Sequence, residues 1–316
     1  MENIDHQYPQ KPTLLKRKSK RHISITIMSI VLFALTFSLI INDYYLIFLL
    51  LGVLLFHELG HFLLMKLFNY EELNMLFIPF MGAMVSGRKK KYSQVESALM
   101  IIAGPLPGIL LGASLLIYNW LPAEALSIQV GVLLIILNVM NLAPIEPLDG
   151  GKLVRVLFFN KFELAQLIFS VISSLAIMGI GIYFNSIVLT IFGFLLGFRI
   201  KGKHKMYLIR KDMEEEGINY ESNYEDLSNK AFSKIKNILI EHTPVLKDLE
   251  EYEEAEKYGH LMAKQVDGVL YPPMKKDASI WFKIFMLLLW GGGIFISIYA
   301  IINKDINSIV NAFQNR

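Results

Sequence analysis

The chain has 316 residues, of which 54% are hydrophobic and 19% are charged, and its mean hydropathy is +0.44. This composition argues against a soluble protein and excludes a disordered one. The chain contains no cysteine, which excludes a disulfide scaffold and limits any metal site to His, Asp or Glu ligands. A net charge of +3 is too small to indicate nucleic-acid binding, so no nucleic-acid partner is expected.

Apolar stretches long enough to cross a bilayer, which takes about 20 residues, recur along the chain. Six are predicted, and a shorter seventh at 186–200 leaves open whether it spans fully. The six stretches lie at 23–41, 44–67, 98–118, 126–142, 164–183 and 280–302. The expected fold class is therefore an all-α polytopic membrane protein with about six to seven transmembrane helices, in the cell membrane.

Positive charge is distributed unevenly between the loops that join these stretches. Lysine and arginine are frequent before the first stretch and at 88–91, whereas the loops at 42–43 and 119–125 contain neither. By the positive-inside rule, the N-terminal segment 1–22 is expected to be cytoplasmic. The first apolar run is too long for a signal-peptide core and has no small-residue cleavage site, so it is expected to be a retained helix.

Residues 201–279 differ in kind from the rest of the chain. They hold 16 of the 28 acidic residues and no long apolar run. Apolar residues recur at helical spacing from Leu227 to Leu239, and a second amphipathic stretch follows Pro244. We expect a small helical cytoplasmic insert, either a solvated spacer or a docking site for a cytoplasmic regulator. The predicted organisation is a basic N-terminus (1–22), a transmembrane domain (23–200), this insert (201–279), a C-terminal transmembrane helix (280–302) and a short tail (303–316).

The second apolar stretch contains the run HELGH at 57–61. Because His57 and His61 are four residues apart, a helix places them on one face, where both can bind one zinc ion. Glu58 lies beside them and can act as general base on a metal-bound water. Ionisable residues inside an apolar span are costly and usually functional. The run therefore predicts a catalytic zinc site.

A catalytic zinc ion takes three protein ligands and a water molecule. Glu71, Glu72 and Glu96 lie in or near a polar, basic loop and are the weaker candidates for the third ligand. Asp149 follows the span at 126–142 in the run NLAPIEPLDGG at 141–151, where prolines and glycines break the helix. Broken backbone at membrane depth is tolerated where it lines a buried cavity. In the predicted topology Asp149 approaches the same side of the membrane as His61, so it is the expected third ligand.

Together these features resemble the site-2 proteases, a family of intramembrane zinc metalloproteases. The resemblance covers about residues 44–160 and rests on the HELGH run, on Asn141 and Pro144, and on the triplet LDG at 148–150. The runs IPFMGA at 78–83 and AGP at 103–105 are also similar to family segments. The resemblance implies a small membrane-associated β-hairpin at 78–87, which would hold substrate by strand addition. An amphipathic cytoplasmic loop is the alternative for this segment.

The resemblance implies hydrolysis of peptide bonds in a membrane-anchored protein or peptide near the cytoplasmic face of the lipid bilayer. One zinc ion would be held by His57, His61 and Asp149, and Glu58 would take the proton of its water. Asn141 would bind the substrate backbone or polarise the scissile carbonyl. Many members carry an asparagine three residues after the AGP proline, where this chain has Gly108, so no role of that asparagine carries over.

Two other functions stay open. The first is a catalytically silent membrane-binding or chaperone relative of the same fold, although such a protein has no need of all four site residues. The second is a metal transporter, in which the general base beside the histidines has no evident task. Glu146, three residues before Asp149, is expected either to support the metal site or to face outward.

Overall fold

The computed structural model describes residues 8–15, 23–79, 82–159, 162–252 and 255–314. By their internal contacts the residues form two compact units. The first, here called the core unit, comprises Ser19–Lys89, Ser93–Lys161 and Lys276–Arg316. The second, called the α7–α11 unit, comprises Met1–Lys18, Lys90–Tyr92 and Phe162–Lys275.

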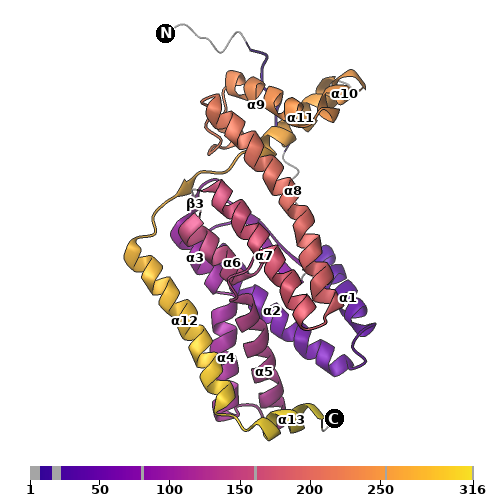
Figure 1. Ribbon diagram of the computed structural model, residues 1–316, viewed down its shortest axis with the longest axis vertical. Coiled ribbons are helices and arrows are strands. Elements are labelled where there is room, and N and C mark those ends of the chain that lie inside the picture. The colour runs from indigo at the N-terminus through magenta and orange to yellow at the C-terminus, as the bar shows by residue number, and fades with distance from the viewer. Residues whose placement is uncertain (1–7, 16–22, 80–81, 160–161, 253–254, 315–316) are drawn as a thin grey trace. The chain divides into compact units, whose positions relative to one another are not determined.

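Among the described residues, five helical segments are long and apolar enough to cross a bilayer. The elements are labelled in Figure 1, and the five segments are α2 (Tyr44–Leu67), α3 with α4 (Gln94–Ile102 and Pro105–Tyr118), α5 (Glu124–Asn141), α7 (Glu163–Tyr183) and α12 (Ile280–Ile302). These segments confirm the predicted fold class, an all-α polytopic membrane protein.

The two remaining predicted spans correspond to α1 and to part of α8. Helix α1 (Ile23–Ser38) is apolar, but its 16 residues reach only about 24 Å, less than the roughly 30 Å of a bilayer core. Helix α8 (Ile187–Glu215) begins with an apolar part that ends before Arg199, and the helix then continues through charged sequence. The predicted domain boundary at residue 200 lies inside α8, and the domain limits stay predictions.

The predicted span at 98–118 consists of two helices rather than one. The Ser93 Oγ accepts a hydrogen bond from the Glu96 N–H at 3.1 Å, so α3 is capped and begins at Gln94, before the apolar run. Helix α3 ends at Ile102, and Pro105 begins α4. Proline is favourable at the first position of a helix, because the N–H that it lacks would have no hydrogen-bond partner within the helix. The AGP triplet is thus the break between two helices.

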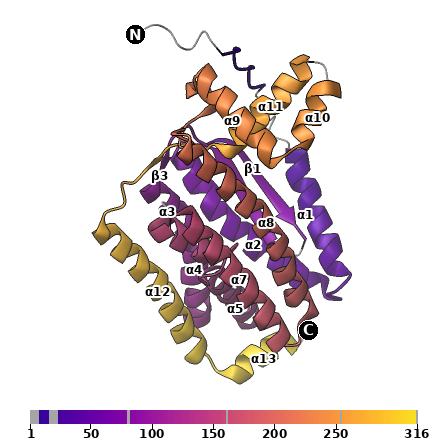
Figure 2. The same ribbon diagram turned by 45° about the horizontal axis from the view of Figure 1, so that its top comes forward.

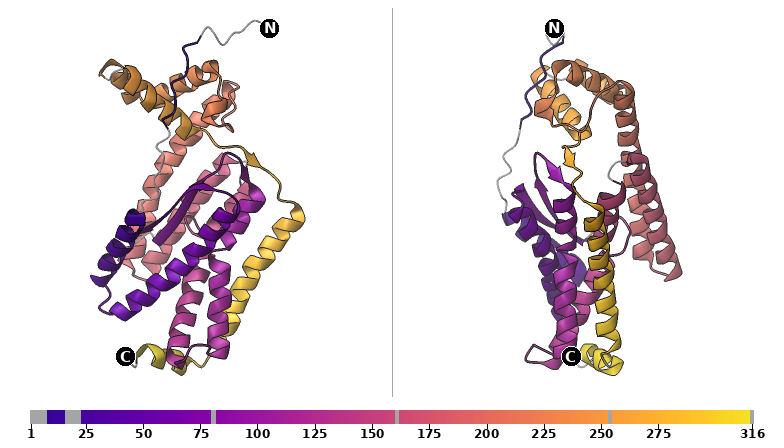
Figure 3. Two further views of the ribbon diagram at one scale, coloured as in Figure 1. Left: turned by 180° about the vertical axis from the view of Figure 1, so that it is seen from behind. Right: turned by 90° about the vertical axis from the view of Figure 1, so that its left-hand side faces the viewer.

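Small residues allow the helices of the core unit to pack closely. A Cβ atom on Gly112 of α4 would lie 2.8 Å from the Gly131 carbonyl oxygen of α5, so the two backbones touch at this crossing. Helix α12 runs along α4 (Figure 3). The Trp290 indole of α12 donates a hydrogen bond to the Leu142 carbonyl oxygen at 2.7 Å. This bond ties α12 to the start of the segment that leads to Asp149.

A buried polar link joins three helices of the core unit. Gln129 of α5 accepts a hydrogen bond from the Tyr45 hydroxyl of α2 at 3.0 Å, and its amide nitrogen donates to the Ala312 carbonyl oxygen. Ala312 belongs to the short amphipathic helix α13 (Ile306–Gln314). Since an unpaired buried amide is costly, these bonds fix α13 against α5.

The core unit also contains a β-hairpin. Strands β1 (Glu71–Ile78) and β2 (Gly82–Arg88) pair antiparallel, with Ile78 opposite Gly82 and Met75 opposite Val85 (Figure 3). The hairpin is longer than the predicted 78–87, because β1 begins at Glu71, within the segment interpreted as a polar loop. A register irregularity follows Glu71, and Glu72 adopts a φ of 52°, as expected for a bulge.

Helix α1 covers the outer edge of β1 (Figure 2). The Thr26 hydroxyl donates to the Met75 carbonyl oxygen at 2.8 Å, and the Phe77 N–H donates to the Ser29 Oγ at 3.1 Å. Met75 and Phe77 therefore direct their backbone groups away from β2. Because backbone direction alternates along a strand, their partners Val85 and Ala83 direct theirs toward the outer edge of β2.

The α7–α11 unit combines a helical hairpin with a small helical cluster. Helices α7 and α8 pack closely, since a Cβ on Gly193 would lie 2.6 Å from the Met178 backbone nitrogen. The end of α8 packs with α9 (Asn229–His242), α10 (Val245–Tyr252) and α11 (Ala255–Val269) around one apolar cluster. A short 3-10 turn (Tyr224–Asp226) precedes α9, and the strands β3 (Tyr92–Ser93) and β4 (Met274–Lys275) pair.

Arg210 holds this unit together. Its side chain, 8% exposed, donates to the Val269 carbonyl oxygen at 2.9 Å and pairs with the Glu163 carboxylate at 3.0 Å. The guanidinium also lies 3.7 Å from the ring centroid of Tyr271. One buried cation thus links the start of α7 to α8 and to the segment after α11.

Replacing Arg210 by methionine is expected to destabilise the α7–α11 unit by about 3 kcal/mol, because it leaves Glu163 and the Val269 carbonyl without their partner. The matched control is Lys211→Met, the exposed neighbour on the same helix, with an expected effect below about 0.5 kcal/mol. Thermal unfolding and limited proteolysis of the detergent-solubilised full chain measure the difference. Equal stability of the two variants would contradict this role of Arg210.

Candidate metal centre

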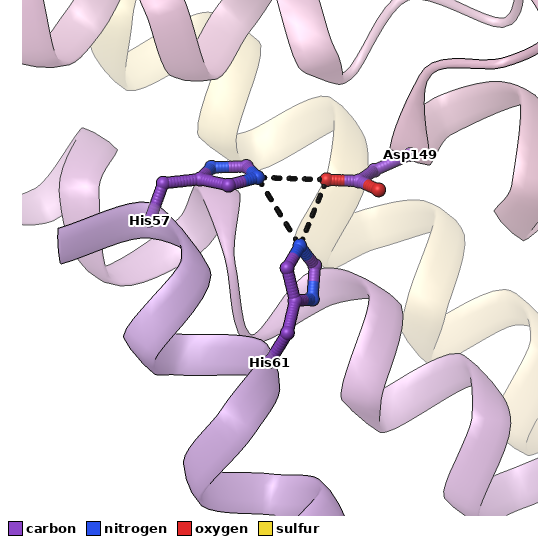
Figure 4. A group of neighbouring side chains, drawn as sticks. All are labelled: His57, His61 and Asp149. Carbon is purple, nitrogen blue, oxygen red and sulfur yellow. Dashed lines mark hydrogen bonds and ion pairs between the residues drawn. The ribbon is translucent and has the colours of Figure 1, made fainter. Parts of the chain in front are cut away.

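Helix α2 places His57 and His61 on one face, one turn apart, as their spacing predicts. Their two Nε2 atoms lie 3.1 Å apart, and the Asp149 Oδ2 lies 3.0 Å from the first and 3.1 Å from the second (Figure 4). All three residues are buried. The structure thus brings the three predicted ligands together into one triangle of donor atoms.

The opposite ring nitrogen of each histidine has an oxygen partner. The His61 Nδ1 lies 2.7 Å from the Met100 carbonyl oxygen, which can only accept, so this nitrogen is assigned as the N–H donor. The His57 Nδ1 lies 2.7 Å from the Oδ1 of Asn138 on α5. With the protons on Nδ1, both lone pairs are on Nε2 and point into the triangle.

The AGP break allows α2 to approach α3 and α4 at the level of the histidines. A Cβ atom on Gly60 would collide with the Ala103 carbonyl oxygen, and one on Gly104 would collide with the His61 ring. The loop between the two helices therefore presents bare backbone to α2. This explains why the segment that contacts the HELGH helix is built from small residues.

Asp149 begins the short helix α6 (Asp149–Val154), after the proline-rich segment that follows α5. A Cβ on Gly150 would collide with the Leu142 carbonyl oxygen, and one on Gly151 would lie 2.5 Å from Ile145. These glycines let α6 fold back onto the preceding loop. Lys152 donates to the Asp149 Oδ1 at 2.9 Å, so this oxygen is occupied and Oδ2 faces the histidines.

The other two predicted site residues lie close to this cluster in the sequence but differ in their contacts. Glu58 is 4% exposed and interacts electrostatically with His57, His61 and Asp149. Asn141 ends α5, and its amide nitrogen donates back to the Leu137 carbonyl oxygen at 3.0 Å. None of the hydrogen bonds within the described part of the chain joins Asn141 to the triangle.

The remaining carboxylates considered from the sequence lie elsewhere. Glu71 and Glu72 belong to β1, and Glu96 pairs with Lys89 at 2.6 Å. Glu146 is buried, and its Oε1 lies 3.4 Å from the Arg155 guanidinium. Glu146 therefore faces inward and stabilises the loop that precedes Asp149. Over the described residues, His57, His61 and Asp149 form the group of donors close enough to share an ion.

Asn138 and Lys152 touch the predicted ligands and were not predicted from the sequence. Asn138 is fully buried within an apolar span, and a polar residue in such a position is a signal that sequence reasoning can use. Lys152 carries no comparable signal, because a lysine beyond the end of a span is also explained by membrane topology.

The donor set suits a tetrahedral zinc ion. Zinc bonds of about 2.0–2.2 Å to imidazole and carboxylate place neighbouring ligand atoms about 3.3 Å apart. The observed separations of 3.0–3.1 Å are close to this value. Two histidines and one carboxylate leave the fourth position for water, which is the arrangement of catalytic rather than structural zinc sites.

Comparison with known proteins gives consistent matches. The model of Peptidase family M50 matches residues 45–122. The chain is 36% identical over 115 residues to stage IV sporulation protein FB of Bacillus subtilis, and 28% identical over 111 residues to a zinc metalloprotease of Methanocaldococcus jannaschii. Each match covers 34% of this chain, and they span only 38% and 32% of the two relatives' lengths.

Among solved structures, the site-2 protease from Methanocaldococcus jannaschii is similar at a TM-score of 0.41 and 22% identity, over 60% of this chain and 93% of that one. The region matched by the family model contains both histidines and the AGP break. These matches support the resemblance to the site-2 proteases through the segment 45–122, which matches Peptidase family M50.

Proposed function

We propose that this protein is an intramembrane zinc protease that hydrolyses peptide bonds of membrane-anchored substrates near the cytoplasmic face. The observation that carries the proposal is the convergence of three donor atoms within 3.1 Å, from residues on two separate helices, beside the buried Glu58. The M50 relatives support the same class of chemistry.

In this proposal His57, His61 and Asp149 hold one zinc ion. A bound zinc ion lowers the pKa of water and acts as a Lewis acid toward a carbonyl group. Glu58 takes the proton of the attacking water and later passes it to the leaving amine. Lys152 keeps Asp149 turned so that one carboxylate oxygen is available to the ion. Asn141 serves as a substrate or oxyanion contact if its amide turns away from Leu137.

The outer edge of β2 is the proposed docking site for the unwound part of the substrate. Helix α1 already satisfies the outer backbone groups of Met75 and Phe77 on β1. Over the described residues, the backbone hydrogen bonds of β2 lead to β1. The backbone groups of Ala83 and Val85, which face outward, can therefore pair with an added strand.

The remaining parts of the proposal concern orientation and partners. The distribution of lysine and arginine supports a cytoplasmic location for the N-terminal segment and for residues 201–279. Besides the bilayer and the substrate, the partner proposed is a cytoplasmic regulator that docks on 201–279.

Replacing Glu58 by glutamine is expected to leave zinc bound and to slow cleavage by at least about 100-fold, because the amide cannot accept the proton. Purified full chain is assayed for zinc content and for cleavage of single-span peptides in liposomes. His57→Ala should lose both zinc and cleavage, and the exposed Glu241→Gln on α9 is the matched control. Cleavage unaffected by Glu58→Gln would sink the proposal, and zinc without cleavage of any peptide by the wild type would favour the silent relative.

Replacing Val85 by proline is expected to reduce cleavage about 10-fold or more through a higher KM, because proline removes an outward N–H while keeping the pairing of β2 with β1. Val85→Thr keeps the N–H and the side-chain shape, so it should cleave like wild type. Zinc content should not change in either variant. Equal kinetics of the proline and threonine variants would rule out strand addition at this position.

A further inference from the structure

Asn138 occupies the space between three helices of the core unit. It lies on α5, three residues before Asn141, and it is completely buried. Its amide nitrogen donates to the Leu134 carbonyl oxygen at 2.7 Å, and its Oδ1 lies 2.7 Å from the His57 Nδ1. Both ends of the amide thus have partners, one on α5 and one on α2.

These contacts fix which way the amide points. A flipped amide would place its oxygen 2.7 Å from the Leu134 carbonyl oxygen, where two acceptors repel each other. The oxygen therefore faces His57, and the His57 Nδ1 must be the donor. The corresponding partner of His61 is the backbone carbonyl of Met100, which no side-chain change can remove.

We propose that Asn138 is a positioning residue, whose Oδ1 holds the His57 ring in the Nδ1–H tautomer with Nε2 directed at the metal centre. The inference rests on the proposed zinc site. Without this acceptor, His57 can protonate Nε2 or rotate its ring, and both changes remove a lone pair from the triangle of donors. Partners of this kind typically contribute 10–100-fold to metal affinity.

Gly108 completes the arrangement from the side of α4. A Cβ atom at this position would lie 2.7 Å from the Asn138 Cγ and would collide with its amide nitrogen. Any side chain at 108 therefore competes with Asn138 for one space. In this chain the asparagine side chain comes from α5, and α4 supplies the glycine that leaves room for it.

The test measures metal binding by the full chain in detergent micelles. Zinc affinity is determined by competition with a chelator, and Co²⁺ replaces zinc so that the visible spectrum reports the ligand geometry. Asn138→Leu should weaken zinc binding about 10–100-fold and change the Co²⁺ spectrum. In Asn138→Asp a protonated carboxyl donates to the Leu134 carbonyl oxygen and keeps its other oxygen as the acceptor that faces His57, so this variant should bind within a few-fold of wild type. Asn141→Leu, the same change one turn away, should leave zinc affinity unaltered.

Gly108→Ala gives an independent test, because its methyl group displaces the Asn138 amide without removing it. It should weaken zinc binding in the same direction, and in the double variant with Asn138→Leu it should add little further loss. The inference would be overturned if the two substitutions weakened zinc binding additively in the double variant. It would also be overturned if Asn138→Leu left the zinc affinity and the Co²⁺ spectrum unchanged. If Asn138→Leu does not fold, the inference is tested by comparing the zinc affinities of Gly108→Ala and Asn138→Asp: weaker binding by the first alone supports it, and equal affinities contradict it. Absence of zinc binding by the wild type would instead count against the proposed function.

Discussion

The contact between the Asp149 carboxylate and the two histidines of α2 is the constraint on which the rest of the core unit depends. Three polar groups are held within 3.1 Å of one another and away from water, which is costly unless each group keeps its partners. The contact also requires α2 and α6 to approach two loops closely. The glycines at 60, 104, 150 and 151 allow that approach, since a Cβ atom on any of them would clash with a neighbouring backbone or with the His61 ring.

The atoms that do not face the triangle are all occupied. Met100 and Asn138 accept from the outer nitrogens of the histidines, and Lys152 holds the second oxygen of Asp149. The cluster is therefore oriented by its own hydrogen-bond partners, and the atoms left over are those that the proposed zinc ion would require. Such preorganisation is what separates a metal centre from a chance meeting of polar side chains in an apolar interior.

The sequence was informative where one local property decides the structure. The apolar runs at 44–67 and 280–302 coincide with α2 and α12, and the HELGH spacing alone places both histidines on one helical face. The break at Ala103 and Gly104 was missed, because the continuous apolar run favoured one span although Gly104 and Pro105 are a local signal for a helix boundary. Asn138 is a different case: as a polar residue inside an apolar span it stands out in the sequence, but its partner His57 depends on α5 facing α2, a tertiary relation that no local pattern contains.

The proposed docking edge of the hairpin depends on helix α1. A peptide that leaves its helix within a bilayer exposes N–H and C=O groups for which lipid offers no partner, at several kcal/mol each. Two hydroxyl side chains of α1, Thr26 and Ser29, already satisfy β1, which leaves β2 as the edge that can accept such a peptide. If cleavage proceeds as proposed, α1 contributes by occupying the outer edge of β1, so that the substrate can pair only with β2. Helix α1 does this without contacting the substrate or the metal ligands.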